Sequence, residues 1–182
     1  MQLFKVSIDK CQFCQTQVKY SMSGHIVSET GVSTDPDKIK AVSQWKPPTN
    51  LKSLQSFLGF CGYYRRFIAN NSSIVRPLTD LTRGYAPPQK GRPTKSDPTK
   101  QFLSKSEPFG DRWNPACAEA FQKIKDWLTN APVLAFADLT KLYILHVDAS
   151  FDGLGAVLNQ ENPEGLRPVA FASRKLSAPE RN

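Results

Sequence analysis

The stretch "LYILHVDASFDGLGAVLNQ" (residues 142–160) contains a candidate catalytic residue. It reads as an apolar strand that ends at Asp148, followed by a turn with glycine and a second strand. Metal-dependent nucleases often hold a carboxylate at such a position, because carboxylate oxygens are good ligands for divalent cations. One carboxylate cannot hold a pair of divalent ions, so this interpretation requires further acidic residues beside Asp148.

A second candidate site lies in "TNLKSLQSFLGFCGYYRRFI" (residues 49–68). Gln55, Gly59 and Tyr63 are spaced i, i+4, i+8, so they share one face of the expected helix. Glycine inside a helix costs roughly 1 kcal/mol relative to alanine, which asks for a reason. Close approach of a nucleic-acid backbone is one reason, and close packing of a second helix is the other. Arg65 and Arg66 follow this face and could reach phosphates.

Charge and composition narrow the class of protein. Hydrophobic residues make up 40% of the 182 residues, which suits a globular core. A net charge of +8 favours a polyanionic partner, and nucleic acid is the leading candidate. A basic soluble protein without such a partner would show the same net charge. Neither a transmembrane run nor a signal peptide is recognisable, so we expect an intracellular protein without a membrane partner.

The cysteines give a weaker signal. Cys11 and Cys14 form a C-x-x-C pair, but no second Cys/His pair at zinc-ribbon spacing completes it. The favoured interpretation is that they are reduced thiols that pack like small apolar residues, and a metal site is the less favoured one.

The elements that would position these residues alternate in type. Short strands are expected within residues 3–34, and helices at residues 35–45, 49–68, 70–82 (interrupted by Pro77) and 113–132. Asp35 and Asn114 are the expected N-caps, each followed by a proline. Residues 83–112 combine five prolines with basic residues and indicate a flexible basic loop or linker. Such a loop could touch phosphates, but a solvated tether is favoured.

Three strands are expected near the C-terminus, at residues 141–147, 154–160 and 168–173. The first is apolar on both faces, which is typical of a central strand. The other two are joined by "ENPEGLR", a hairpin-like turn. Ser177 and Glu180 then have capping-box spacing and predict the start of a helix, so we expect a truncated domain. The fold class is α+β.

Three long motifs resemble a known family. "VSTDPDKIKAVSQWKPPTNLKSLQSFLGFCGYYRRFI", "AFQKIKDWLTNAPVLAFAD" and "ILHVDASFDGLGAVLNQ...RPVAFASRKLS" are similar to the Pol polyprotein of gypsy-type LTR retrotransposons, in the same order. The resemblance implies the end of a reverse transcriptase palm at residues 1–34 and a helical thumb at residues 35–82. After the loop at 83–112, it implies a connection helix and an incomplete ribonuclease H-like sheet of three antiparallel strands at residues 113–182.

The resemblance assigns Asp148 as one carboxylate ligand of the ribonuclease H metal site. In the intact family enzyme Mg²⁺ is the expected cofactor, and the other carboxylates would lie beyond Asn182. The Tyr-x-Asp-Asp turn of the polymerase site would lie before this sequence, and no adjacent Asp-Asp pair occurs in it. We therefore expect a chain with neither polymerase nor nuclease activity by itself.

The resemblance also places the face of Gln55, Gly59 and Tyr63 against the minor groove of a template–primer duplex. It compares the hairpin at residues 18–27 with a primer-grip turn, in which Tyr20, Gly24 and His25 match the family pattern. "Ser-Met-Ser" stands where one leucine is expected, so a shifted register or a bulge is predicted. For His25 a structural or exposed role is the favoured interpretation.

The resulting interpretation is a fragment of a retrotransposon reverse transcriptase/ribonuclease H. Its ancestral roles are RNA-directed DNA synthesis and RNA cleavage in RNA–DNA hybrids, and hybrid or duplex nucleic acid is the expected partner. The alternatives are a non-catalytic nucleic-acid-binding module and a domesticated protein-interaction protein.

Overall fold

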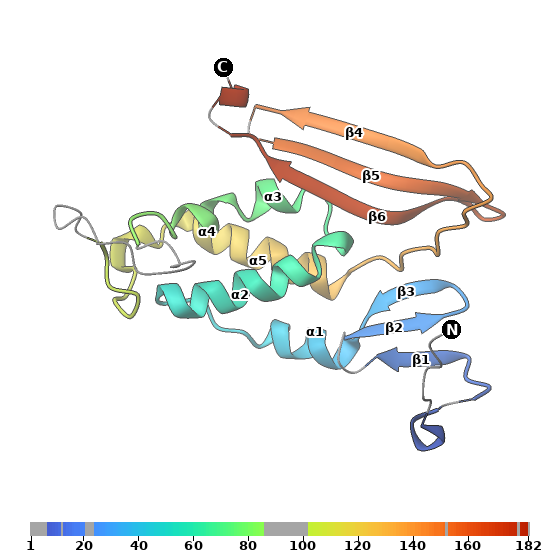
Figure 1. Ribbon diagram of the computed structural model, residues 1–182. Helices are drawn as coiled ribbons and strands as arrows, with labels where there is room; N and C mark the ends of the chain where they lie inside the picture. The colour runs from blue at the N-terminus through green and yellow to red at the C-terminus, as the bar shows by residue number, and fades with distance from the viewer. Residues whose placement is uncertain are drawn as a thin grey trace, which may run out of the picture.

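The computed structural model describes residues 7–11, 13–20, 24–85, 102–151, 153–177 and 179–181. A layer of helices lies between two antiparallel sheets of three strands each, as Figure 1 shows. The predicted α+β class is therefore confirmed for the part of the chain that the structure describes. Within that part, no helix is long and apolar enough to span a membrane.

The N-terminal sheet has the strand order β1-β2-β3, with β1 at Gln17–Tyr20, β2 at His25–Ser28 and β3 at Gly31–Thr34. The expected strand at residues 3–8 lies mostly outside the described residues, and Ile8–Lys10 form a short 3₁₀ helix instead. Tyr20 pairs directly with His25, and β1 and β2 keep one register throughout. The predicted register shift is therefore absent from the paired strands, and residues 21–23, where a bulge would fall, lie outside the described residues.

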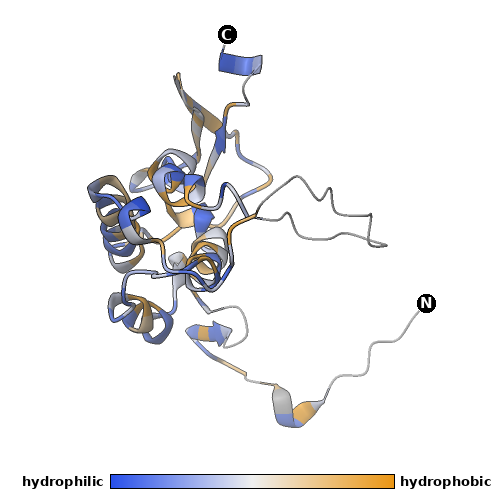
Figure 2. Cartoon of the chain, turned by 90° about the vertical axis from the view of Figure 1, so that its left-hand side faces the viewer, coloured by the Kyte–Doolittle hydropathy of each residue, from blue (hydrophilic) through white to orange (hydrophobic). Residues whose placement is uncertain are grey.

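The helical layer begins with α1 (Pro36–Ser43) and α2 (Leu51–Tyr63), and continues with α3 (Asn71–Ile74), α4 (Arg76–Asp80) and α5 (Pro115–Thr129). The predicted caps are confirmed: the Asp35 side chain accepts a hydrogen bond from the Asp37 amide, and the Asn114 side chain accepts one from the Cys117 amide. Apolar and polar residues share the same helices in Figure 2, as expected for helices with one buried face.

The core lies where α2 and α5 meet. Phe57 of α2 is fully buried, and its ring centroid lies 4.6 Å from that of Phe121 on α5. Trp45 closes the same cluster with its ring edge against Phe57. Helix α2 ends earlier than predicted: Tyr64 and Ile68 lie beyond it, in and after a turn that leads through a 3₁₀ helix at Arg65–Phe67. Both side chains are nevertheless buried.

The end of the predicted linker, at residues 109–112, belongs to this core, while residues 86–101 lie outside the described residues. Phe109 is buried, and its amide donates to the Thr49 carbonyl at 2.8 Å. Arg112 donates to the carbonyls of Leu81 and Arg83 and so holds the segment after α4. A single buried phenylalanine and a guanidinium with several acceptors fix residues 109–112, whereas the composition of the segment emphasised its prolines and charges.

The C-terminal sheet has the order β4-β5-β6, with β4 at Ile144–Ser150, β5 at Gly153–Asn162 and β6 at Gly165–Lys175. The predicted hairpin between the second and third strands is confirmed. The prediction of a central position for the first strand is wrong for the described residues. β5 occupies the centre, and all residues of β4 are exposed, including Val147 at 62%.

Residues 131–135 join the two sheets. Val32 of β3 and Leu134 exchange two backbone hydrogen bonds of 2.8 Å, and the Ala135 amide donates to the Pro168 carbonyl of β6. Gly31 makes this approach possible, because a Cβ there would lie 2.1 Å from the Leu134 carbonyl oxygen. The N-terminal hairpins and the C-terminal sheet are therefore held at fixed positions by one short segment.

Candidate nucleic-acid interface

The outer face of α2 is exposed along its whole length. Asn50 caps the helix together with Ser53, so its start is fixed. Gln55, Gly59 and Tyr63 all lie on the surface. A Cβ placed on Gly59 would meet no described atom within 4 Å. Helix–helix packing, one of the two explanations considered for this glycine, therefore does not apply within the described residues.

Two arginines extend this surface. Arg65 and Arg66 are exposed in the 3₁₀ helix directly after α2. Phe67 is fully buried between them and the core, and the Arg66 guanidinium lies 5.8 Å from the centroid of its ring. The buried phenylalanine fixes the turn, so both cations are held at the end of the α2 face.

Gly24, which directly precedes β2, is hydrogen-bonded to the residue at the same end of α2. The Tyr64 hydroxyl donates to the Gly24 carbonyl at 3.1 Å, and the Asp35 amide donates to the same oxygen at 2.9 Å. Gly24 has a φ of +63°, and a Cβ there would lie 2.2 Å from the Tyr64 hydroxyl. Burial raises the pKa of the Tyr64 hydroxyl, which favours the protonated form that donates this hydrogen bond.

His25 lies inside an aromatic cluster. Its ring centroid is 5.3 Å from Tyr63, 5.5 Å from Tyr64 and 5.5 Å from Phe67. Its Nδ1 lies 3.3 Å from the Tyr63 hydroxyl. These contacts favour the structural role expected for His25. They also show that His25 and Tyr63, which the sequence placed in two separate candidate sites, lie in contact, with the buried Gly24 directly before His25. Tyr20, which pairs with His25, is 54% exposed.

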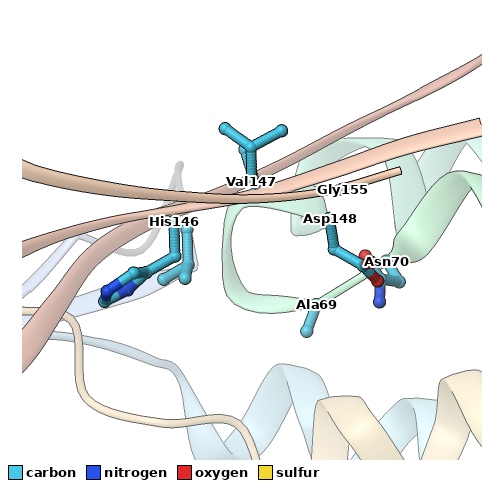
Figure 3. Close-up of a pocket in the computed structure, with 8 residues that line it drawn as sticks. Ala69, Asn70, His146, Val147, Asp148 and Gly155 are labelled. Carbon is cyan, nitrogen blue, oxygen red and sulfur yellow. The ribbon is translucent and has the colours of Figure 1, made fainter.

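Asp148 is exposed on β4, on the face of the sheet that looks toward the helices. In Figure 3 its side chain points toward Asn70, whereas that of Val147 points to the opposite side. The described residues contain no group of three or more His, Cys, Asp or Glu side chains able to hold a metal ion. The single carboxylate at Asp148 does not fit a two-ion site by itself.

Sequence reasoning missed the residues that surround Asp148. Two pockets of about 180 and 160 Å³ flank it, and both are also lined by Asn70 and Gly155. Ser72 and Ser73 line the second pocket. Asn70 lies about eighty positions before Asp148 in the chain, and no local pattern links them, so only a spatial structure could reveal this neighbourhood.

Gln160 was missed as well. Its side chain is 1% exposed and accepts from the Asp138 amide while it donates to the carbonyls of Asp138 and Lys141. These three hydrogen bonds hold the loop that leads into β4, and so they position the strand that carries Asp148.

Residues 113–182 match the family model described as "RNase H-like domain found in reverse transcriptase". Over 179 residues the chain is 36% identical to the Retrovirus-related Pol polyprotein from transposon opus of Drosophila melanogaster. The aligned segment covers 98% of this chain and 16% of that protein. The Pol polyprotein from transposon gypsy of the same species is 35% identical over the same length, again with 16% of that protein covered. The Tf2-3 polyprotein of Schizosaccharomyces pombe is 34% identical over 174 residues, 95% of the chain and 11% of that protein.

Solved structures show the same fold. The foamy viral protease-reverse transcriptase in complex with dsDNA superimposes with a TM-score of 0.67 at 21% identity, over 92% of this chain and 30% of that one. The same foamy viral protein in complex with RNA/DNA hybrid superimposes with a TM-score of 0.65 at 22% identity, over 92% of this chain and 19% of that one. At such identities the likeness supports the fold alone.

The sequence identity extends over nearly the whole chain, across both sheets and the helical layer. The chain spans about 16% of the length of the first Drosophila relatives that it matches. It corresponds to a segment of retrotransposon Pol polyproteins such as those of opus and gypsy, and its residues 113–182 match the ribonuclease H-like domain found in reverse transcriptase.

Proposed function

We propose that this chain forms the nucleic-acid-guiding part of a reverse transcriptase with ribonuclease H activity. In this assignment residues 1–34 are the end of the palm and residues 35–82 are the thumb. Residues 113–182 begin the ribonuclease H-like domain after the segment at 83–112. The outer face of α2 would track an RNA–DNA hybrid or a duplex, and Asp148 would supply one carboxylate of the nuclease site.

The observation that carries the proposal is the bare surface at Gly59. Because no described atom packs against Gly59, the helix backbone there is open to a close ligand, and Gln55 and Tyr63 flank it with hydrogen-bonding groups. Arg65 and Arg66 add positive charge at one end, in a chain of net charge +8. The structural neighbours were solved with dsDNA and with RNA/DNA hybrid, which agrees with this kind of ligand.

Catalysis by the chain alone is not part of the proposal. Mg²⁺ is the expected cofactor of the intact enzyme, in which several carboxylates hold two ions. Asp148 alone cannot both activate water and stabilise a leaving oxygen. Mg²⁺-dependent cleavage of a hybrid that disappears in Asp148→Asn would overturn this part of the assignment.

Binding is tested by fluorescence anisotropy with an RNA–DNA hybrid, from about 50 to about 200 mM salt. The expected affinity falls steeply with salt, since each neutralised phosphate releases counterions. Arg65→Ala/Arg66→Ala should weaken binding and reduce the magnitude of the salt slope by about 2, or about 1 for each lost phosphate contact. A Lys123→Ala control, on the exposed side of α5, should change the slope less. Absence of binding at about 50 mM salt would end the proposal.

A second candidate, a protein-interaction role, is favoured by β4. This strand is exposed on both faces and at its edge in the described structure, and it carries Leu145 at 60% and Val147 at 62% exposure. Such an edge pairs readily with another strand. Light scattering that shows a folded oligomer of one size would support this role, whereas a monomer, or a heterogeneous aggregate, would count against it.

A further inference from the structure

The pockets beside Asp148 are built by two distant parts of the chain. Asp148 pairs with Gly155, and Gly155 pairs with Ser173, so these residues form one row across the sheet. The Ser173 hydroxyl accepts a hydrogen bond of 2.8 Å from the Ser72 amide. This row therefore faces the segment formed by the start of α3 and the residue directly before it, Asn70.

Asn70 is the residue of this segment that lies against the row. A Cβ on Gly155 would lie 1.8 Å from the Asn70 Oδ1 atom, so the absence of a side chain at Gly155 makes room for the amide. Asn70 adopts a left-handed conformation with φ of 51°, which asparagine tolerates better than most residues. Its side chain thus lies beside Asp148, as Figure 3 shows, and both residues are exposed to solvent.

The chemistry of the lining selects a class of ligand. The Asn70 amide can donate and accept, the Asp148 carboxylate accepts, and Ser72 and Ser73 bring hydroxyls. A phosphate placed here without a metal ion would be repelled by the carboxylate. A sugar hydroxyl suits the set, because it can donate to the carboxylate or the amide oxygen while it accepts from the amide nitrogen. In a hybrid, only the RNA strand carries a 2′-hydroxyl.

We infer that Asn70 recognises the ribose 2′-hydroxyl of the RNA strand in the pocket beside Asp148. The helical part of the chain thereby contributes an RNA-selective contact to the ribonuclease H-like part. This inference rests on the proposed function, because it presupposes that the chain binds a hybrid. It adds a residue outside the matched ribonuclease H-like region, which begins at residue 113.

The test compares two hybrids of one sequence by anisotropy: RNA–DNA, and a 2′-fluoro-RNA–DNA hybrid that keeps an A-like sugar pucker without the hydroxyl. EDTA is present, so that a metal bridge cannot contribute. The wild-type chain should bind the RNA–DNA hybrid about 3- to 10-fold more tightly, the effect of losing a net hydrogen bond. Asn70→Gly keeps the left-handed backbone, removes the amide and should bind both hybrids equally. The matched control is Asn71→Ala, one residue away and outside both pockets, which should keep the wild-type ratio.

The outcomes separate the two proposals. If neither hybrid binds, the proposed function fails. If the wild-type chain binds both hybrids with equal affinity, the inference is overturned while hybrid binding stands. The same holds if Asn70→Gly lowers the affinity for both hybrids by the same factor. A preference that Asn70→Gly retains would likewise assign the 2′-hydroxyl contact elsewhere. Circular dichroism of each variant shows whether it is folded.

Discussion

The outer face of α2 and the edge strand β4 are both exposed, yet they expose different chemistry. Gln55, Gly59 and Tyr63 on α2 present polar groups and bare backbone, whereas Leu145 and Val147 on β4 present large apolar side chains. Helix α2 also has a fully buried inner face, while β4 has no buried residue in the described structure.

The difference shows that exposure alone does not identify a functional surface. A polar face with a bare glycine suits a hydrated, charged ligand that approaches the backbone closely. An apolar strand with a free edge suits another polypeptide, which can supply both backbone hydrogen bonds and apolar contacts. Nucleic acid is therefore expected at α2 and at the face of β4 that carries Asp148, and a protein partner at the free edge of β4 and the opposite face, which carries Val147.

The largest expected difference concerns the free energy of unfolding, which substitutions on the inner face of α2 should change far more than substitutions on β4. Phe57→Ala should lower the free energy of unfolding by about 3–5 kcal/mol, because a fully buried aromatic ring leaves a cavity. Val147→Ala should change it by about 0.5 kcal/mol or less, since that side chain is 62% exposed. Urea denaturation of both variants measures this contrast. A large cost at Val147 would show that β4 is covered in solution.

A smaller loss of stability is expected at Gly24, which is hydrogen-bonded to Tyr64 at the end of α2. Gly24→Ala should lower the free energy of unfolding by about 1–3 kcal/mol, because the added Cβ collides with the Tyr64 hydroxyl at a positive φ. Thermal unfolding followed by circular dichroism provides the measurement. Tyr64→Phe, which removes only the hydroxyl, serves as the comparison and should relieve part of the clash in the double variant. Unchanged stability in Gly24→Ala would mean that the turn is not fixed to α2.

Gly59→Ala should act in the opposite direction on stability. The helix should gain up to about 1 kcal/mol, since the new methyl group meets no described atom and alanine favours helices. Binding of the RNA–DNA hybrid should nevertheless weaken, because the methyl group keeps a ligand away from the backbone. Denaturation and anisotropy on the same sample separate the two effects. Gly62, which also has no described atom near a Cβ, is the control position, and an equal binding loss in Gly62→Ala would argue against a specific role of Gly59.

The smallest effect concerns pH at the end of the chain. Hydrogen bonds from the Arg174 side chain, and then from the Ser177 backbone and hydroxyl, lower the pKa of Glu180 to about 2. A carboxyl with a depressed folded-state pKa stabilises the fold above its ordinary pKa, and this contribution is lost as the pH falls toward about 2. Amide exchange at Ser177 should therefore accelerate in acid. In Glu180→Gln this acceleration, corrected for the intrinsic rate, should vanish.

Patterns of short range were readable from the sequence. The caps at Asp35 and Asn114 and the hairpin between β5 and β6 depend on neighbouring residues, and all are present. The interruption predicted at Pro77 falls at Val75 instead, and Pro77 lies in the first turn of α4, where proline is tolerated. The end of α2 was placed too late, because Tyr64 and Ile68 continue the apolar pattern after the helix has ended. Periodicity reports burial, and a buried turn after a helix can satisfy it equally well.

The candidate site was only partly predictable, for a related reason. The face of Gln55, Gly59 and Tyr63 follows from helical spacing alone, and the resemblance of the motifs placed Asp148 in the nuclease region. The position of Asn70 beside Asp148 depends on how α3 packs on the sheet, which no local pattern encodes.

The sequence by itself determined the type of most elements, the family and the net charge, because periodicity, capping and identity are properties of residues along the chain. The tertiary structure decided which surfaces are bare and which residues meet. Among the described residues, it placed β4 at an edge, brought Asn70 over Gly155, and left Gly59 without a packing partner. These features arise from contacts between residues far apart in sequence, whose geometry is set by the packing of whole elements.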